Sequence, residues 1–470
     1  MMTVNRDIKP KGRLKKKSRI IRLLAVSRRY MSERTLVMIM AVVIGLLAGL
    51  AAYLLKLMVR YVSDHLLATI TLPGFSWLYL FVPVTGIMLT VIYQHYILGK
   101  EIDHGVRRML SKIESRDYRI DRDITYAPLF ASTLTLGFGG SAGCEGPIGY
   151  AGGAIGSNLA RFFKLRPDLV RAMIGIGAGA GIAGIFKAPI GGVLFTLEVM
   201  RMNLAGSLVL ALLLAAIIAA GTAFILSGYT PDVVFTSVEQ AGHVNLMYVA
   251  VFGIFCGIYS LYYSGIMNMM RQFYGRISAF WGRGLLSGAI LSVLIFAFPA
   301  LYGDGYGVIS RVLSDDGTAV ARSAFSIAGA SSEVSLILIS GIVLLVKAFA
   351  TSSSNSGGGV AGDFAPTLFA GCAAGVFFTL VASHCFGVEL PVSDYAFIGM
   401  ASVMAGVIRA PFMAAFIVVE ITFDLTLVVP MALAVALSFG VVRTRTVIDF
   451  YGRRRRWSVI EYIRQKILKK

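Results

Sequence analysis

The residue with the clearest capacity for chemistry is Glu145, a carboxylate in the Gly-rich apolar segment GSAGCEGP. No Lys or Arg occurs between Arg122 and Arg161 to pair with it. An ionisable side chain inside an apolar segment is costly and marks a functional site by default. At a Gly-rich helix start, free backbone N–H groups favour negative charge, so a carboxylate there competes with an arriving anion for one place. Glu145 is therefore predicted to gate an anion site that protonation would open, and the alternative is a carboxylate at a wet helix end with no role.

The segment around Glu145 occurs twice in the chain. Residues 139–156 align without gaps with residues 358–375, and nine of the 18 positions are identical. Further on, residues 184–199 align with residues 406–421, and each copy has a basic residue, Ala-Pro and a glutamate nine residues after the proline. Duplicated apolar segments that Gly and Pro interrupt are typical of a transporter built from two halves, with its site where the broken helices of both halves meet.

The composition predicts a membrane protein. Hydrophobic residues make up 57% of the chain and charged residues 15%, and the mean hydropathy is +0.76, which excludes a water-soluble globule. Runs of about 20 apolar residues predict spanning helices. These lie at 36–60, 76–98, 207–227, 245–268, 284–302, 334–350, 395–421 and 424–442, with Gly-rich stretches at 127–160, 171–200 and 364–386. We expect an all-α polytopic membrane protein whose transport domain, 35–445, consists of repeat halves 35–228 and 245–445.

The net charge of +19 is concentrated at the two ends. Residues 1–34 carry 12 Lys and Arg against two acidic residues, and residues 443–470 carry 10 against two. Basic flanks stay on the cytoplasmic side, so both termini of this multi-pass protein are predicted inside. We expect the membrane to be a bacterial inner membrane. The basic segments 1–34 and 446–470 are predicted to contact anionic membrane lipids. Nucleic-acid binding is the competing interpretation, and it is not favoured because no folded domain surrounds the tails.

Other chemistries find no support in the sequence. Cys144, Cys256, Cys372 and Cys385 lie within or beside apolar stretches and have neither metal-ligand spacing nor a disulfide framework. An intramembrane enzyme would need a nucleophile–base pair or a metal site, and neither is visible, so we expect no enzyme and no cofactor. A membrane receptor or scaffold is the alternative from another class, but it gives no reason for duplicated helix breaks around one carboxylate.

These motifs resemble those of the CLC family of chloride channels and chloride/proton antiporters. GSAGCEGP is similar to the family signature G-x-x-x-G-[RK]-E-G-P, and GDFAP at 362–366 is similar to G-x-F-x-P. The resemblance covers about 35–460. It implies two inverted-topology helical repeats, a homodimer with one pore per subunit, and bound chloride or a similar small anion at the starts of several helices.

The resemblance also implies site residues. By position, Glu145 corresponds to the gating glutamate of the family. The residues that would surround the anion are Gly143, Cys144, Gly146, Gly362, Asp363, Phe364 and Ala365. Because a carboxylate pointing into an anion site would repel the substrate, we expect Asp363 to point away or to pair with a cation.

Two positions depart from the family pattern. The family serine that coordinates the anion corresponds to His104, in DHGVR, and the family tyrosine near the last membrane helix corresponds to Trp457. Each ring N–H could donate to an anion. His104 is equally consistent with an unrelated loop residue, and Trp457 with an anchor at the membrane border.

The third departure bears on the mechanism. Proton-coupled members have a Glu-Glu pair after the first Ala-Pro segment, and here the pair reads Glu198-Val199. Since valine carries no proton, Val199 favours channel-like conduction. A chloride/proton or a fluoride/proton antiporter stays open, the latter because the fluoride branch also differs at the serine position and near the internal glutamate. Glu198 could carry protons instead, or it could have a structural role at a helix end, as its repeat partner Glu420 suggests.

Overall fold

The protein is helical throughout the part that the structure describes. This computed structural model describes residues 32–70, 76–102, 105–204, 206–230, 245–314, 316–321 and 333–446. Across these ranges nine helices are long and apolar enough to cross a membrane, and the one extended pairing is an isolated antiparallel bridge. The prediction of an all-α polytopic membrane protein is confirmed. The basic tails lie almost entirely outside the described residues, so the location of the termini stays a prediction.

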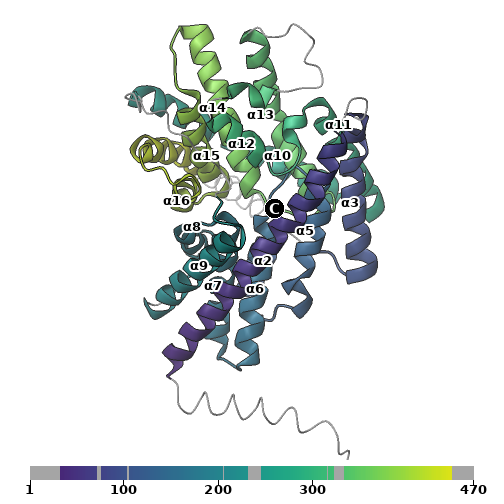
Figure 1. Ribbon diagram of the computed structural model, residues 1–470, viewed down its shortest axis with the longest axis vertical. Coiled ribbons are helices and arrows are strands. Elements are labelled where there is room, and N and C mark those ends of the chain that lie inside the picture. The colour runs from purple at the N-terminus through teal and green to yellow at the C-terminus, as the bar shows by residue number, and fades with distance from the viewer. Residues whose placement is uncertain are drawn as a thin grey trace, which may run out of the picture.

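The helices of the first half begin with the longest one. They are α2 Glu33–Ile70, α3 Val82–Ile92, α4 Gly105–Glu114, α5 Ala127–Gly137, α6 Glu145–Phe162, α7 Pro167–Phe186, α8 Pro189–Leu194 and α9 Gly206–Leu226. Two of them continue into π-helical turns, α3 into Tyr93–Leu98 and α8 into Phe195–Val199. In Figure 1, α2 runs diagonally along this half and packs against α7 and α9.

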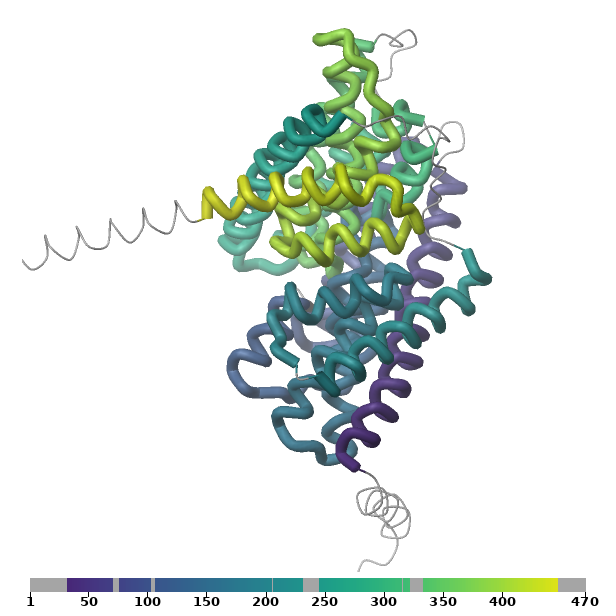
Figure 2. The backbone as a smooth tube through the Cα atoms, turned by 90° about the vertical axis from the view of Figure 1, so that its left-hand side faces the viewer, coloured from purple at the N-terminus to yellow at the C-terminus, as the bar shows by residue number. Residues whose placement is uncertain are grey.

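The helices of the second half follow the same order of broken and continuous segments. They are α10 Leu246–Gly275, α11 Phe280–Ala297, α12 Tyr306–Leu313, α13 Glu333–Ser356, α14 Phe364–Phe386, α15 Val392–Ile408 and α16 Pro411–Thr422, and a last helix spans Val428–Thr446. Figure 2 shows most first-half helices on one side of the molecule and the second-half helices on the other. α3 crosses over to pack against α11, and α8 and α16 meet where the halves join.

The predicted single span at 395–421 is wrong. The chain breaks into α15 and α16 at Arg409, which has a left-handed φ of 63°, and Pro411 begins the next helix. The same break separates α7 from α8, where Lys187 has a φ of 55° before Pro189. Proline disfavours a helical residue before it and supplies no N–H, so Ala-Pro ends one helix and starts another in each half.

Glycine permits the closest helix contacts, and these contacts are duplicated as well. A Cβ added at Gly152 of α6 would meet the carbonyl oxygen of Gly177 of α7, and one added at Gly177 would meet the carbonyl of Gly152. Gly371 of α14 and Gly399 of α15 have the same reciprocal relation. Such approach of two backbones is typical of small residues at membrane helix interfaces.

We predict that Gly152→Ala lowers stability because the added methyl group must separate α6 from α7. Overpacking of this kind costs about 1–3 kcal/mol. Gly307→Ala is the matched control, since Gly307 lies in helix α12 with nothing within 4 Å of an added Cβ. The measurement is the midpoint of thermal aggregation of the detergent-solubilised protein. Equal midpoints for the two variants would contradict the close-packing interpretation.

Candidate anion-binding site

Two helix starts, one from each half, meet at a direct backbone pairing. The Gly143 N–H donates to the Gly362 carbonyl at 2.9 Å, and the Gly362 N–H donates to the Gly143 carbonyl at 2.6 Å. α6 begins two residues after Gly143, and α14 begins two residues after Gly362. Neither N-cap residue, Cys144 or Asp363, caps its helix through its side chain. The free amides of both first turns and the positive ends of both helices therefore converge on one place.

Glu145 occupies this place. Its side chain is 1% exposed, and a Cβ added at Gly362 would lie 2.9 Å from its Oε2. The backbone N–H groups of Glu145 itself and Ala365 lie against the carboxylate, while Oε2 has no hydrogen-bond partner among the described residues. A Cβ at Gly143 would collide with the carboxylate, so only glycine leaves room for it there. A carboxylate in this position takes the place that two converging helix starts offer to an anion.

The structure gathers most of the predicted site residues at this junction. Cys144, Gly146, Phe364 and Ala365 lie in or next to the first turns of α6 and α14, and a Cβ at Gly146 would lie 3.0 Å from the Ala361 carbonyl oxygen. His104 and Trp457 lie outside the described residues. The role of each residue toward an anion stays a prediction.

Asp363 is expected to point away from the anion site or to pair with a cation, and its partner among the described residues is a neutral amide, so the cation pair is not present there. Its Oδ1 accepts a hydrogen bond of 2.5 Å from Nδ2 of Asn355, at the end of α13. Asp363 is half-buried and lines a cavity of about 310 Å³ together with Val199, Tyr263 and Phe364. The carboxylate-bearing residue thus borders open space on one side of the junction.

Glu198 and Glu420 each bind the helix start of the opposite half. The Glu198 carboxylate accepts from the N–H groups of Phe412 and Met413, at 3.4 and 2.8 Å, in the first turn of α16. The Glu420 carboxylate accepts from Ile190 and Gly191, at 2.9 and 2.7 Å, in the first turn of α8. Each glutamate satisfies orphan amides and opposes the positive helix end, so the pair joins the two halves.

Comparison with known proteins identifies the family of this chain. The family model described as voltage gated chloride channel matches residues 85–443. The chain belongs to the CLC family. It is a multi-pass membrane protein of an anion-transporting family, and the resemblance inferred from the two signatures is confirmed.

Several solved CLC structures share the fold. A slow cyanobacterial Cl⁻/H⁺ antiporter is 21% identical to this chain, with a TM-score of 0.74. The match covers 88% of this chain and 95% of the antiporter chain. A CLC-type fluoride/proton antiporter is 23% identical with a TM-score of 0.70, covering 87% and 96%. A eukaryotic CLC transporter is 20% identical with a TM-score of 0.65, covering 88% and 73%.

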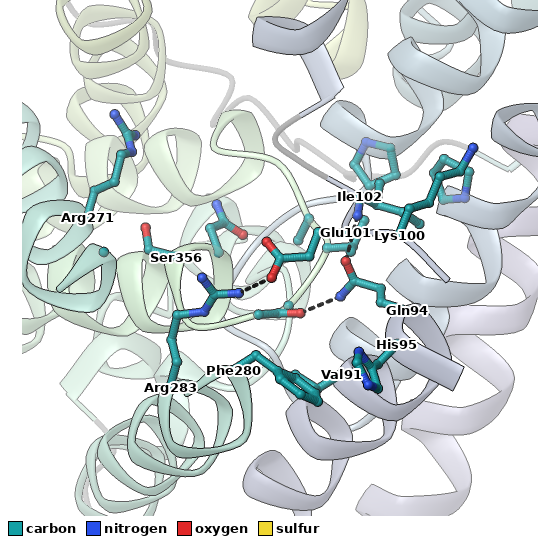
Figure 3. A pocket seen from close by; sticks show the side chains of 18 of the residues that line it. Val91, Gln94, His95, Lys100, Glu101, Ile102, Arg271, Phe280, Arg283 and Ser356 are labelled. Atoms are coloured by element: carbon teal, nitrogen blue, oxygen red, sulfur yellow. Dashed lines mark hydrogen bonds and ion pairs between the residues drawn. The ribbon is translucent and has the colours of Figure 1, made fainter. Parts of the chain in front are cut away.

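Two cavities with basic walls approach the CLC helix junction. The larger, of about 620 Å³, is drawn in Figure 3 and reaches Pro147 of α6 and Ala361 beside Gly362. The smaller, of about 310 Å³, shares Arg107, Arg271 and Ala361 with it. Positive walls raise the local concentration of anions, so both cavities suit the approach of an anion to the junction.

Charged groups at the edge of the larger cavity are partly paired. Arg283 donates to Glu101 at 2.7 Å, as Figure 3 shows. Lys100 binds Asp121 and Asp123, at 2.8 and 2.7 Å, and its hydrogen bond lowers the pKa of Asp121 below the ordinary value. These acids offset some of the positive charge at the rim.

Gln94 is a site residue that sequence reasoning missed. Its Nε2 donates to the Gly358 carbonyl at 2.7 Å, and its Oε1 accepts from the Ile102 N–H at 2.7 Å (Figure 3). It thereby joins the π-helical turn after α3 to the loop that leads to Gly362. An isolated Gln in the apolar run 76–98 is too common a signal to have revealed this role.

Lys347 is the second residue that was missed. It is fully buried in α13, its Nζ donates to the Ser141 hydroxyl at 2.8 Å, and it lies 4.5 Å from the centre of the Phe369 ring. The Ser141 N–H in turn donates to the Ser354 hydroxyl at 2.8 Å. Lys347 therefore positions the loop before Glu145 and places behind it an amino group that can carry a positive charge. A single lysine in the apolar stretch 334–350 was the available signal.

We predict that Lys347→Met weakens anion transport, because it removes a buried positive charge near the helix junction. A loss of about 1.4 kcal/mol of anion stabilisation corresponds to a tenfold change in binding, and a unit charge near a partly buried site can contribute at least this much, so the half-saturating anion concentration should rise at least about tenfold. The measurement is anion efflux from proteoliposomes. Ser141→Ala, which keeps the lysine, should change this concentration much less. Lys112→Met, at a partly exposed lysine paired with Asp117, should leave it unchanged. Equal effects of Lys347→Met and Ser141→Ala would show that only the hydrogen bond matters.

Proposed function

We propose that this CLC protein exchanges a small anion for protons across the membrane, with Glu145 as the gate. The observation that carries the proposal is the position of the Glu145 carboxylate between the starts of α6 and α14, against Gly143 and Gly362. An anion and the carboxylate would compete for the same amides and the same positive helix ends. Protonation would neutralise the side chain and release it, so that proton binding and anion binding are linked.

Channel-like conduction is the second candidate, and Val199 favours it. The buried Glu145 carboxylate at the junction suits a gated channel as well as an exchanger. Two of the similar structures are described as antiporters, one for Cl⁻ and one for fluoride, which supports exchange as the first candidate. Chloride is the proposed anion and fluoride the alternative. We further propose a homodimer with one pore per subunit and bound chloride ions, and both termini on the cytoplasmic side of a bacterial inner membrane.

An ion-gradient experiment tests exchange directly. Proteoliposomes with an outward or inward chloride or fluoride gradient are clamped in potential by potassium and valinomycin, while external pH is recorded. We expect uphill proton movement in a fixed ratio to the anion. Anion flux without uphill proton movement would establish the channel candidate and reject exchange.

The gate has its own test in Glu145→Gln. The wild-type flux should rise as pH falls, because protonation neutralises the carboxylate that occupies the anion site. The neutral amide of Glu145→Gln mimics the protonated side chain, so the variant should show anion flux that no longer varies with pH and should lose proton coupling. A variant that keeps the wild-type pH dependence would exclude Glu145 as the gate.

A further inference from the structure

The helix junction contains a second carboxylate. Glu145 is the first residue of α6, and Asp363 is the N-cap residue of α14. Each lies within two residues of the Gly143–Gly362 bridge, so each half places an acidic residue at the helix junction. The repeat alignment places Asp363 opposite Cys144, so the second carboxylate is not a copy of the first.

Asp363 borders the cavity that also contains Val199. This smaller cavity extends from Gly146 and Gly362 at the junction to Arg271 and Asn268 of α10. Val199, the position at which proton-coupled family members have a glutamate, is aliphatic. Asp363 supplies a carboxylate-bearing residue to the same cavity. Glu198, the other candidate, lines neither cavity, and both of its oxygens accept from the first turn of α16.

The surroundings of Asp363 suit a group that gains and loses a proton. Asn355, the hydrogen-bond partner of Asp363, lies near two serines at the end of α13. Three buried oxygens there have no hydrogen-bond partner among the described residues: Asn355 Oδ1, Ser352 Oγ and Ser356 Oγ. Buried polar atoms of this kind are normally satisfied by ordered water. Water at these atoms would connect Asp363 to the cavities, because Asn355 and Ser356 line the larger one.

The charged groups that face Asp363 keep it compatible with an anion path. The cavity wall carries Arg107, Arg271 and Arg409, and its other titratable side chain is Tyr263, which is fully buried. The guanidinium groups stay charged at all relevant pH values. They offset the repulsion between the Asp363 carboxylate and the transported anion.

We propose that Asp363 transfers protons between the smaller cavity and Glu145, in the role that Val199 cannot perform. A hydronium ion in the cavity gives up a proton, which forms an O–H bond on Asp363 and leaves water. That O–H bond then breaks, and the proton passes through intervening water to the Glu145 carboxylate, which regenerates ionised Asp363 and leaves Glu145 neutral and displaceable. The proposal rests on the exchange function proposed above.

The test is Asp363→Asn in the potential-clamped proteoliposome assay with a chloride gradient. We expect proton uptake to fall at least about tenfold, as for loss of a positioned acid–base group, while passive chloride flux persists. Asp363→Glu should keep proton uptake because it keeps a carboxylate. Asp168→Asn is the matched control, since Asp168 also lies in the first turn of a helix, α7, but is exposed and away from both cavities.

The outcomes separate this proposal from the exchange function. If the wild type moves no protons uphill, exchange itself is rejected and the role of Asp363 with it. If the wild type couples protons and Asp363→Asn couples them in the same ratio, only the role of Asp363 is rejected. Loss of coupling in Glu198→Gln but not in Asp363→Asn would assign the proton route to Glu198 instead. Chloride flux in Asp363→Asn reports that the variant is folded.

Discussion

The structure depends on a negative group between the starts of α6 and α14, because these two positive helix ends would otherwise repel each other. The starts of α6 and α14 face each other across the Gly143–Gly362 bridge, so two positive helix ends and their free amides converge without side-chain caps. A carboxylate or an anion between them stabilises the arrangement. Glu145 supplies the carboxylate, and in the proposed gating mechanism an anion would replace it or a proton would neutralise it.

Carboxylates also bind helix starts at two places away from the site. Glu198 binds the start of α16 and Glu420 binds the start of α8, so each half satisfies orphan amides of the other. The broken helices of one half are therefore stabilised by the other half, as expected where irregular backbone lies at membrane depth and lipid offers no hydrogen bonds. Neither half would present a satisfied site by itself.

The basic and acidic groups around the junction have opposite effects on an approaching anion. Lys347 behind the loop and the arginines of the two cavities make the approach positive, which favours anions over the long range. The carboxylates of Glu145 and Asp363 oppose that field at short range. Because a proton would neutralise a carboxylate and leave the arginines unchanged, the proposed exchange predicts that protonation favours anion entry.

The sequence by itself determined the membrane embedding, the duplication and the location of Glu145, because apolar run length, repeat spacing and a lone carboxylate are local properties of the chain. The sequence also predicted that the Gly-rich segments form the site. Only the tertiary structure decided the break of 395–421 at Arg409, the reciprocal binding by Glu198 and Glu420, and the roles of Lys347 and Gln94. Lys347 binds Ser141, which is 206 residues away, and Gln94 binds Gly358, which is 264 residues away. No local pattern specifies such a partner. For Asp363, the family resemblance implied a place at the anion site, and only the tertiary structure placed it in the same cavity as Val199.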